Sequence, residues 1–376
     1  MDLELTDEQR ELASTVGRMM KSHYDAEKRD AILKTDNGYS DEMWGRYAEL
    51  GALALPFPED VGGAGMGFGE VAVVLEELGK SLALEPYIST VLLGGGLVNE
   101  AGTDAQKEEL LGAVAEGSLK LAFAAQEPGR RYDLTSPSTT ATGSGDSYTV
   151  TGEKTGVLGG DTADKLIVSA TVDGETGLFI VDASGDGVSR MNLKQADGFG
   201  AANVLLKDAP AQRLGSGDAA ETIQKVIDVA TAGLCAEAVG AMDTSLKMTG
   251  EYLRTRVQFG QPIGVNQALQ HRAADMYVSL ELAKSMALFA RLAVTGERNE
   301  NTHRDVIAAK IEINKCAQHI SQESIQMHGG IGMTMEYPIG HFAKRLTVIM
   351  RTFSDTDELV AELAAAGGLI KASAEV

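Results

Sequence analysis

The sequence has little of what membrane-spanning, secreted or disulfide-stabilised proteins require. No apolar run in its 376 residues reaches the roughly 18 residues that span a bilayer, so we expect no membrane insertion. The only two cysteines, Cys235 and Cys316, lie in apolar helical stretches and indicate small core residues rather than a disulfide. The N-terminal stretch MDLELTDEQREL lacks the basic and apolar regions of a signal peptide, so we expect a cytoplasmic protein.

Basic residues are also scarce. The chain has 33 Lys and Arg against 54 Asp and Glu, which gives a formal net charge of -21. This balance argues against nucleic acid or an anionic membrane as a partner, because phosphate contacts need a basic surface. It leaves room for a phosphorylated small ligand held by a few local cations. The six histidines are scattered, and none shares a metal-ligand spacing with a carboxylate or cysteine, so we expect no metal site.

The hydrophobic period changes twice along the chain. Residues 1–117 have a helical period, and Thr6 stands three residues before Gln9, which is the spacing of a capping box. Residues 118–217 consist of short β-branched runs, and long helical patterns return over 218–376. We therefore predict an α+β multidomain protein with an N-terminal helical domain, a middle β domain and a C-terminal helical bundle.

The middle segment has the composition of a compact antiparallel β domain. Turn sequences such as GSGD, DGE and SGDG separate its apolar runs. These runs are LKLAFAAQE, SYTVTGEK, DKLIVSATV, TGLFIVDA and ANVLLKDA.

The C-terminal segment contains candidate ligand-binding junctions between its helices. One long helix ends in RTRVQFGQPIG, the next begins at NQALQ, and the third ends in QMHGGIGMTMEYP. Exposed backbone N–H groups, Arg256 and the aromatic Phe259 together could hold a pyrophosphate and an adenine. Each feature alone is more typical of an ordinary helix C-cap.

The wording and order of these motifs resemble the acyl-CoA dehydrogenase family over nearly the whole chain. The specific part is RxQFGxPI, then Q…ADM, then QxHGGxGxxxEYP, and LPFPEDVGGAG and GDSYTVTGEK support it. The resemblance implies that family's fold, with a C-terminal four-helix bundle and FAD at a dimer interface. It also implies oxidation of an acyl-CoA thioester to the 2,3-enoyl-CoA.

The positions that hold the ADP half of FAD in the family are all matched. In the family these residues contact FAD that is bound mainly to the neighbouring subunit. The residues that the resemblance assigns to FAD binding here are Arg256, Phe259, Gln267, Gln326, Gly329 and Gly330.

The positions that supply the catalytic base in the family are not matched. The reaction needs a carboxylate to remove the proton alpha to the thioester. Phe353 stands where most members have this glutamate, and Asp355 stands where a neighbouring threonine contacts FAD. Ala230 holds the alternative base position on the first bundle helix, and Asp228 lies about 200° away around that helix. We therefore assign no catalytic residue to this chain.

The flavin-contacting half of the family pattern is also altered. In KTGVLGG, Gly156 replaces an aromatic residue and Leu158 replaces a threonine. Arg130 and Arg131 occupy a loop that is small and polar in the family. These arginines are either bulky blockers of the flavin site or part of a solvated loop.

Three hypotheses remain open at this stage. The first is an accessory subunit, resembling the small subunits of heteromeric dehydrogenases such as pimeloyl-CoA dehydrogenase. The resemblance then implies an α2β2 heterotetramer with a homologous subunit, an acyl-CoA substrate and electron-transfer flavoprotein as acceptor. The second is a self-sufficient dehydrogenase that uses Asp355 or Asp228 as the base. The third is a catalytically silent assembly protein.

Overall fold

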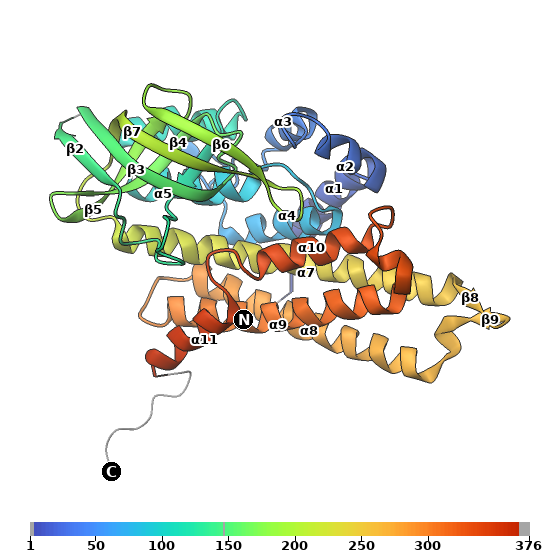
Figure 1. The fold of residues 1–376 in the computed structure, drawn as a ribbon. Coiled ribbons are helices and arrows are strands. Elements are labelled where there is room, and N and C mark those ends of the chain that lie inside the picture. The colour runs from blue at the N-terminus through green and yellow to red at the C-terminus, as the bar shows by residue number, and fades with distance from the viewer. Residues whose placement is uncertain (1–3, 146, 368–376) are drawn as a thin grey trace, which may run out of the picture. The chain divides into compact units, whose positions relative to one another are not determined.

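The chain divides into two compact units, which we describe separately. Figure 1 labels their helices and strands. The structure, a computed structural model, describes residues 4–145 and 147–367. Of these, the helical unit comprises residues 4–28, 72–83 and 231–367, and the β-containing unit comprises 29–71 and 84–230. The domain limits expected from sequence follow the order of the chain instead, and they stay a prediction.

Helices supply most of the regular structure. The α-helices are α1 (Asp7–His23), α2 (Ala26–Leu33), α3 (Asp41–Glu49), α4 (Phe68–Ser81), α5 (Gly95–Ala101), α6 (Asp104–Ala115), α7 (Ala220–Thr255), α8 (Gln267–Thr295), α9 (Thr302–His328), α10 (Ile339–Ile349) and α11 (Thr356–Ala365). Shorter turns are η1 (Glu59–Val61), η2 (Ile88–Gly94), η3 (Ile263–Val265) and η4 (Gly329–Met333).

The helical unit begins with the capping box that the sequence predicts. The Thr6 side chain accepts a hydrogen bond from the Gln9 backbone N–H, and the Gln9 side chain accepts one from the Thr6 N–H. Both bonds satisfy backbone donors at the start of α1 that have no partner within the helix.

Two glycines bring α4 and α7 into backbone contact within this unit. A Cβ atom at Gly79 would overlap the carbonyl of Glu237, and one at Gly240 would overlap the carbonyl of Glu76. Only glycine permits so close an approach of two helices, because any larger residue would separate their backbones.

A buried ion pair joins α7 to α10. Arg345 donates to both carboxylate oxygens of Glu237, at 2.6 and 2.7 Å. The side chains are only 6% and 4% exposed. Each of these deeply buried groups is the other's partner in place of water, so this contact fixes α10 against α7.

The β-containing unit is built on one seven-stranded sheet. Its strands are β1 (Leu121–Ala124), β2 (Thr140–Ser144), β3 (Ser147–Leu158), β4 (Lys165–Val172), β5 (Glu175–Asp182), β6 (Val188–Lys194) and β7 (Gly200–Leu214). The pairings β4–β2–β3–β7–β5–β4 form a closed ring, with β1 added beside β4 and β6 beside β7. Pairing is antiparallel except where β1 and β2 meet β4.

The ring encloses an apolar core. Leu166, Val168, Phe179 and Val204 are fully buried there, and the ring of Tyr148 lies 5.2 Å from that of Phe179. The sequence prediction of a β domain between helical segments is therefore confirmed in kind. The parallel pairings to β4 were not predicted, and neither were the polar strands β2 and β6.

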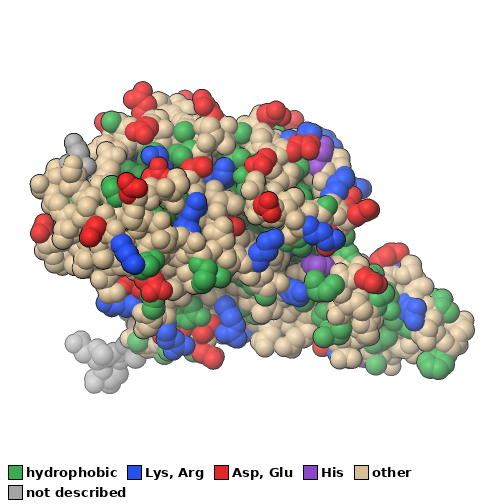
Figure 2. Space-filling model, turned by 45° about the horizontal axis from the view of Figure 1, so that its top comes forward, with side chains coloured by type: hydrophobic (Ala, Val, Ile, Leu, Met, Phe, Trp, Pro, Cys, Tyr) green, Lys and Arg blue, Asp and Glu red, His purple; other side chains and the backbone are tan. Residues whose placement is uncertain are grey.

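The surface carries charges of both signs. On the face drawn in Figure 2, Asp and Glu side chains are interspersed with Lys and Arg rather than gathered in one patch. Among the described residues, no helix combines the length and the hydrophobicity needed to cross a bilayer.

Replacing Arg345 by methionine should destabilise the protein strongly. The substitution leaves the Glu237 carboxylate buried without its partner, at a cost of roughly 3–5 kcal/mol. Urea unfolding monitored by circular dichroism measures this loss.

Lys247→Met is the matched control, since Lys247 pairs with Asp243 at 2.6 Å on α7 but is 73% exposed. It should cost less than about 1 kcal/mol. Equal losses for the two substitutions would show that the buried pair has no special role.

Candidate functional site

A short hairpin after α7 displays the predicted aromatic residue. Strands β8 (Val257–Gln258) and β9 (Gln261–Pro262) flank a two-residue turn formed by Phe259 and Gly260. Both turn residues have positive φ, 54° and 84°, as type I′ turns require. An aromatic residue in this left-handed conformation is strained by roughly 1–2 kcal/mol, yet Phe259 is fully exposed at 103%. Neither the strain nor the exposure of this side chain stabilises the isolated chain. Such a combination is typical of a residue that contacts a ligand or another chain.

The cation beside this hairpin has no partner within the described chain. Arg256 is exposed, and its guanidinium makes no hydrogen bond or ion pair to a described residue. Its backbone is fixed, because Arg256 N–H donates to Tyr252 and its carbonyl accepts from Ile263. Arg254 in contrast pairs with Glu251 at 2.6 Å. Among 54 acidic residues, an unpaired arginine on a fixed backbone is well suited to bind a phosphate.

The structural reason for glycine differs among the three glycines after α9. Gly329 has φ of 63°, which favours glycine, and a Cβ at Gly332 would lie 3.0 Å from the Ile325 carbonyl. Gly330 has neither reason, because its φ is not positive and a Cβ there would meet nothing within 4 Å. The absence of a side chain at the exposed Gly330 therefore suits something outside this chain that approaches its backbone.

Three helix ends meet at this side of the bundle. The ring of Tyr252 near the end of α7 lies 4.5 Å from that of His328 at the end of α9. Near the start of α8, Arg272 donates to Glu323 of α9, at 2.5 and 3.0 Å. The hairpin projects from the same end in Figure 1.

All six residues predicted to bind FAD are exposed at this bundle end. They come from the hairpin and the residue before it, the first residue of α8, the last turn of α9 and the glycines that follow α9: Arg256, Phe259, Gln267, Gln326, Gly329 and Gly330. The arrangement of one cation, one aromatic side chain and open glycine backbone fits a dinucleotide. The assignment of each residue to FAD stays a prediction.

The late base position lies in a loop that a buried lysine anchors. The Lys310 ammonium donates to Ile349 O at 2.7 Å and to Asn314 Oδ1 at 2.6 Å. The Asn314 amide in turn donates to Met350 O and to Thr356 Oγ1, at 3.3 and 3.2 Å. Burial lowers the pKa of Lys310 to about 8. The network holds both ends of the loop between α10 and α11, and the sequence contained no sign of it.

Within this loop, an apolar residue stands at the predicted base position, and the nearby aspartate has a structural role. Phe353 has φ of 66°, a strained conformation for an aromatic residue. Asp355 is the N-cap of α11, and its carboxylate accepts a hydrogen bond from Glu358 N–H at 3.1 Å. A local capping role explains the presence of this aspartate.

The early base position is apolar. Ala230 on α7 is fully buried. Asp228 is 1% exposed, and its carboxylate accepts a hydrogen bond from Gln224 at 3.0 Å. Both carboxylates considered as relocated bases thus have other partners.

The strand that the resemblance predicts to contact the flavin, β3, has an irregularity where the family has an aromatic residue. The pairing of β3 with β7 shifts register between Lys154 and Val157. Gly156 lies in this bulge with φ of 59°, and its N–H donates to Asn203 Oδ1 at 2.9 Å. Any side chain introduced there would be strained by its backbone. Leu158 follows in the same strand, half-buried.

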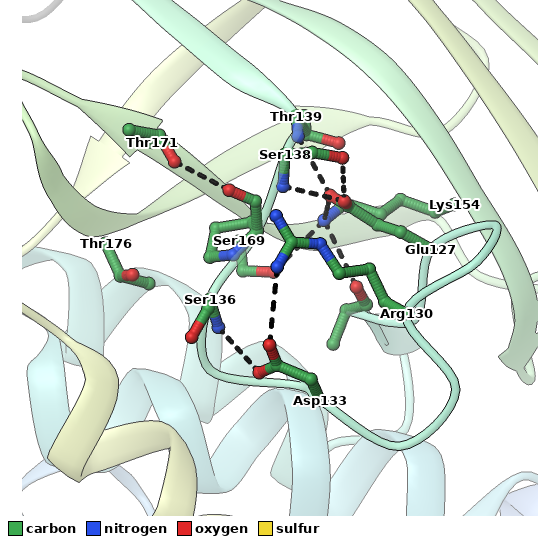
Figure 3. Close-up of polar contacts among 12 residues, drawn as sticks. Glu127, Arg130, Asp133, Ser136, Ser138, Thr139, Lys154, Ser169, Thr171 and Thr176 are labelled. Carbon is green, nitrogen blue, oxygen red and sulfur yellow. Dashed lines mark hydrogen bonds and ion pairs between the residues drawn. The ribbon is translucent and has the colours of Figure 1, made fainter.

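A buried ion pair stabilises the loop before β2 (Figure 3). The Lys154 ammonium lies 2.7 Å from Glu127 Oε1 and also donates to Ala125 O and Ser169 Oγ. Burial lowers the pKa of Lys154 to about 8. Burial alone would raise the pKa of Glu127, but hydrogen bonds, first from Lys154 and then from Ser138 and Thr139, lower it to about 2. Both groups are therefore charged at neutral pH.

The two arginines of that loop are exposed. Arg130 pairs with Asp133 at 3.5 Å, and both side chains are more than a third exposed. Arg131 is also exposed, with φ of 49°. This placement favours the solvated loop over the bulky blocker.

The chain matches models for all three domains of the acyl-CoA dehydrogenases. The N-terminal, middle and C-terminal models match residues 6–118, 122–208 and 219–368. The chain is 30% identical over 346 residues to acyl-CoA dehydrogenase IpdE2 of Mycobacterium tuberculosis, covering 90% of this chain and 91% of that protein.

Two solved structures are similar to this chain over almost its whole length. One is the Tcur3481-Tcur3483 steroid ACAD variant, with a TM-score of 0.86 and 31% identity over 96% of this chain and 99% of that chain. Another is the ChsE4-ChsE5 complex from Mycobacterium tuberculosis, with a TM-score of 0.88 and 25% identity over 97% of this chain and 98% of that chain.

Substituting Asp355 should separate a capping role from a catalytic one. Asp355→Asn keeps an oxygen acceptor for Glu358 N–H, so stability and turnover of the flavin-loaded protein should change little. Asp355→Ala removes the acceptor and should lower the free energy of unfolding by about 1 kcal/mol. Asp228→Asn likewise keeps an acceptor for Gln224, and turnover should stay within a few-fold.

Denaturant unfolding and steady-state acyl-CoA oxidation measure these effects. Loss of a true base costs roughly 10²–10⁴-fold in rate. A loss of that size in either Asn variant, with flavin content unchanged, would place the base in this chain.

Proposed function

Since the chain belongs to the acyl-CoA dehydrogenase family, which depends on FAD, we propose that it is one subunit of a heteromeric dehydrogenase. This subunit completes the ADP half of its partner's FAD site. The partner supplies the flavin pocket and the base. The substrate is an acyl-CoA thioester, which becomes the 2,3-enoyl-CoA. FAD, when bound, supplies the acceptor for the hydride that leaves the beta carbon.

The observation that carries this proposal is the apolar character of both family base positions. Phe353 and Ala230 offer no proton acceptor, and the nearby Asp355 and Asp228 accept hydrogen bonds within the chain. Removal of the alpha proton therefore needs a carboxylate from elsewhere. A second chain of the same family has one at a corresponding position.

The exposed bundle end gives this chain its own role in such a complex. Arg256 is free to bind a phosphate, Phe259 to stack on a planar ring, and Gly330 to let a ligand approach the backbone. Two solved relatives are named as pairs of different chains, which supports a homologous partner and an α2β2 assembly. Electron-transfer flavoprotein is the acceptor we infer for the complex, and we infer a cytoplasmic location.

The other hypotheses are less well supported. A self-sufficient enzyme would need an aspartate that leaves its present hydrogen bond and reaches the substrate. A silent assembly protein would account for an exposed Phe259 that contacts another chain, but it has no physical need for an unpaired Arg256 that suits a phosphate.

Expressed alone, this chain should hold little FAD, because the flavin contacts at Gly156 and Leu158 are altered. Co-expression with a homologous dehydrogenase encoded beside it should yield a flavin-containing complex. Visible absorbance of the purified proteins measures flavin content. Stoichiometric flavin in the lone chain would contradict the accessory role and favour a self-sufficient enzyme.

Replacing Arg256 by alanine should weaken FAD binding by the complex about ten- to a hundredfold. A charge-assisted contact to phosphate contributes roughly 1.5–3 kcal/mol, which corresponds to this range. Fluorescence titration of the flavin-free complex with FAD measures the change.

Arg254→Ala is the matched control, because Arg254 is also exposed but pairs with Glu251. It should leave FAD affinity nearly unchanged. If both variants bind FAD as tightly as the unsubstituted complex, Arg256 serves only as a cation at a helix end, and the proposal that this bundle end completes the FAD site fails.

A further inference from the structure

Three rings, of which one pair is stacked, pack against one another next to the glycine turn, and we call this cluster the stack. His328 is the last residue of α9, and its ring is 5.0 Å from that of Tyr337 and 4.5 Å from that of Tyr252. Tyr252 comes from α7, and Tyr337 from the segment before α10. The rings of Tyr252 and Tyr337 also meet, edge to face, at 6.1 Å. The stack thus joins three segments at the point where the chain enters Gly329.

Only one protonation state of His328 suits this position. Its Nδ1 lies 2.7 Å from the Ser324 carbonyl, which can only accept, so Nδ1 carries the hydrogen. Nε2 is buried and makes no hydrogen bond to a described residue. On a neutral ring this atom holds a lone pair. A second proton would add a charge and a donor without an acceptor, in a side chain that is 3% exposed.

Two acidic residues on the helices that carry these rings are paired with arginines. On α7, Glu251 pairs with Arg254 at 2.6 Å, and on α9, Glu323 binds Arg272. Burial first, and then Tyr252 and Glu251, raise the pKa of Tyr337, so this phenol stays neutral. None of these groups offsets a charge on His328, and burial lowers the pKa of its imidazole.

We propose that the Tyr252–His328–Tyr337 stack positions the Gly329–Gly330 turn for the dinucleotide, and that protonation of His328 releases this turn. The proposal rests on the proposed function, because the turn matters to FAD only if the bundle end binds it. Gly329 N–H donates to the carbonyls of Gln326 and Ile325, so the direction of the turn follows the last turn of α9. His328 is therefore a positioning residue, and FAD binding should be sensitive to acid.

Whether FAD affinity rises or falls with pH depends on which state of His328, stacked or released, binds the proton more tightly. The released imidazole titrates in the ordinary histidine range near pH 6.5, and the stacked imidazole only below it. Acid therefore favours the released state. FAD affinity should be fully present above the ordinary range. It should be lost as the pH falls through the pKa of the stacked ring, by up to about tenfold per pH unit.

The test measures the FAD dissociation constant of the flavin-binding form of the protein, complex or lone chain, from about pH 5 to 8. The unsubstituted protein should bind FAD more weakly at the acid end. His328→Phe keeps a stacking ring that cannot be protonated, so its affinity should be constant with pH. His328→Asn keeps an N–H for Ser324 O but no ring. It should bind more weakly at all pH values and also lack the acid loss.

A second histidine on the same helix provides the control. His319 lies on α9, with Nδ1 2.8 Å from Ser279 Oγ, and His319→Phe should retain the acid loss in full. If His328→Phe does not fold, His328→Asn gives the same pH readout.

Either of two results would overturn the proposal: an unsubstituted protein with no acid loss, or an acid loss that persists in both His328 variants. FAD binding by Arg256→Ala at neutral pH distinguishes a failure of the proposed function from a failure of the role of His328. If that variant binds FAD normally, the proposed function fails. If it binds weakly while the His328 variants retain the acid loss, only the role of His328 is wrong.

Discussion

The proton on the carbon beside a thioester carbonyl can leave only to a base within hydrogen-bonding reach. This constraint decides how the rest of the chain is interpreted. The chain keeps the three-domain match to its family, yet Phe353 and Ala230 are the residues that the family motifs predict at the positions of the base. Asp355 caps a helix and Asp228 accepts a hydrogen bond from its own helix. We therefore propose that a dehydrogenase built on this chain draws its base from a second chain.

This chain lacks a base, but it has an exposed bundle end that can bind a ligand. Phe259 is strained and fully solvent-exposed, Arg256 has no partner among the described residues, and Gly330 has no internal reason to be glycine. Each of these features lowers or fails to raise the stability of the isolated chain. A ligand and a neighbouring subunit that cover this surface would account for all three together. The buried pair of Glu237 and Arg345 and the loop anchored by Lys310 hold the surrounding helices in place.

The long helices, the apolar strands and the family motifs could be predicted from sequence because period and turn chemistry are local. Strands β2 and β6 could not, since TATGS and VSRMNLK are mostly exposed and lack an apolar face. The six expected cofactor residues were predicted by motif, whereas their shared exposure needed the packing of α7, α8 and α9. His328 and Lys310 were not singled out, because a buried polar side chain is recognised by its surroundings, and these come from distant segments.

The division of labour between two chains is tested most directly by counting flavins in the intact complex with native mass spectrometry. In a pair of unlike chains, this chain's bundle end and the partner's flavin pocket make one complete site. The reciprocal site would need the altered Gly156 strand and a base that this chain lacks. The account predicts one FAD for each pair of chains. One FAD for every chain would contradict it, because each subunit would then have a complete site.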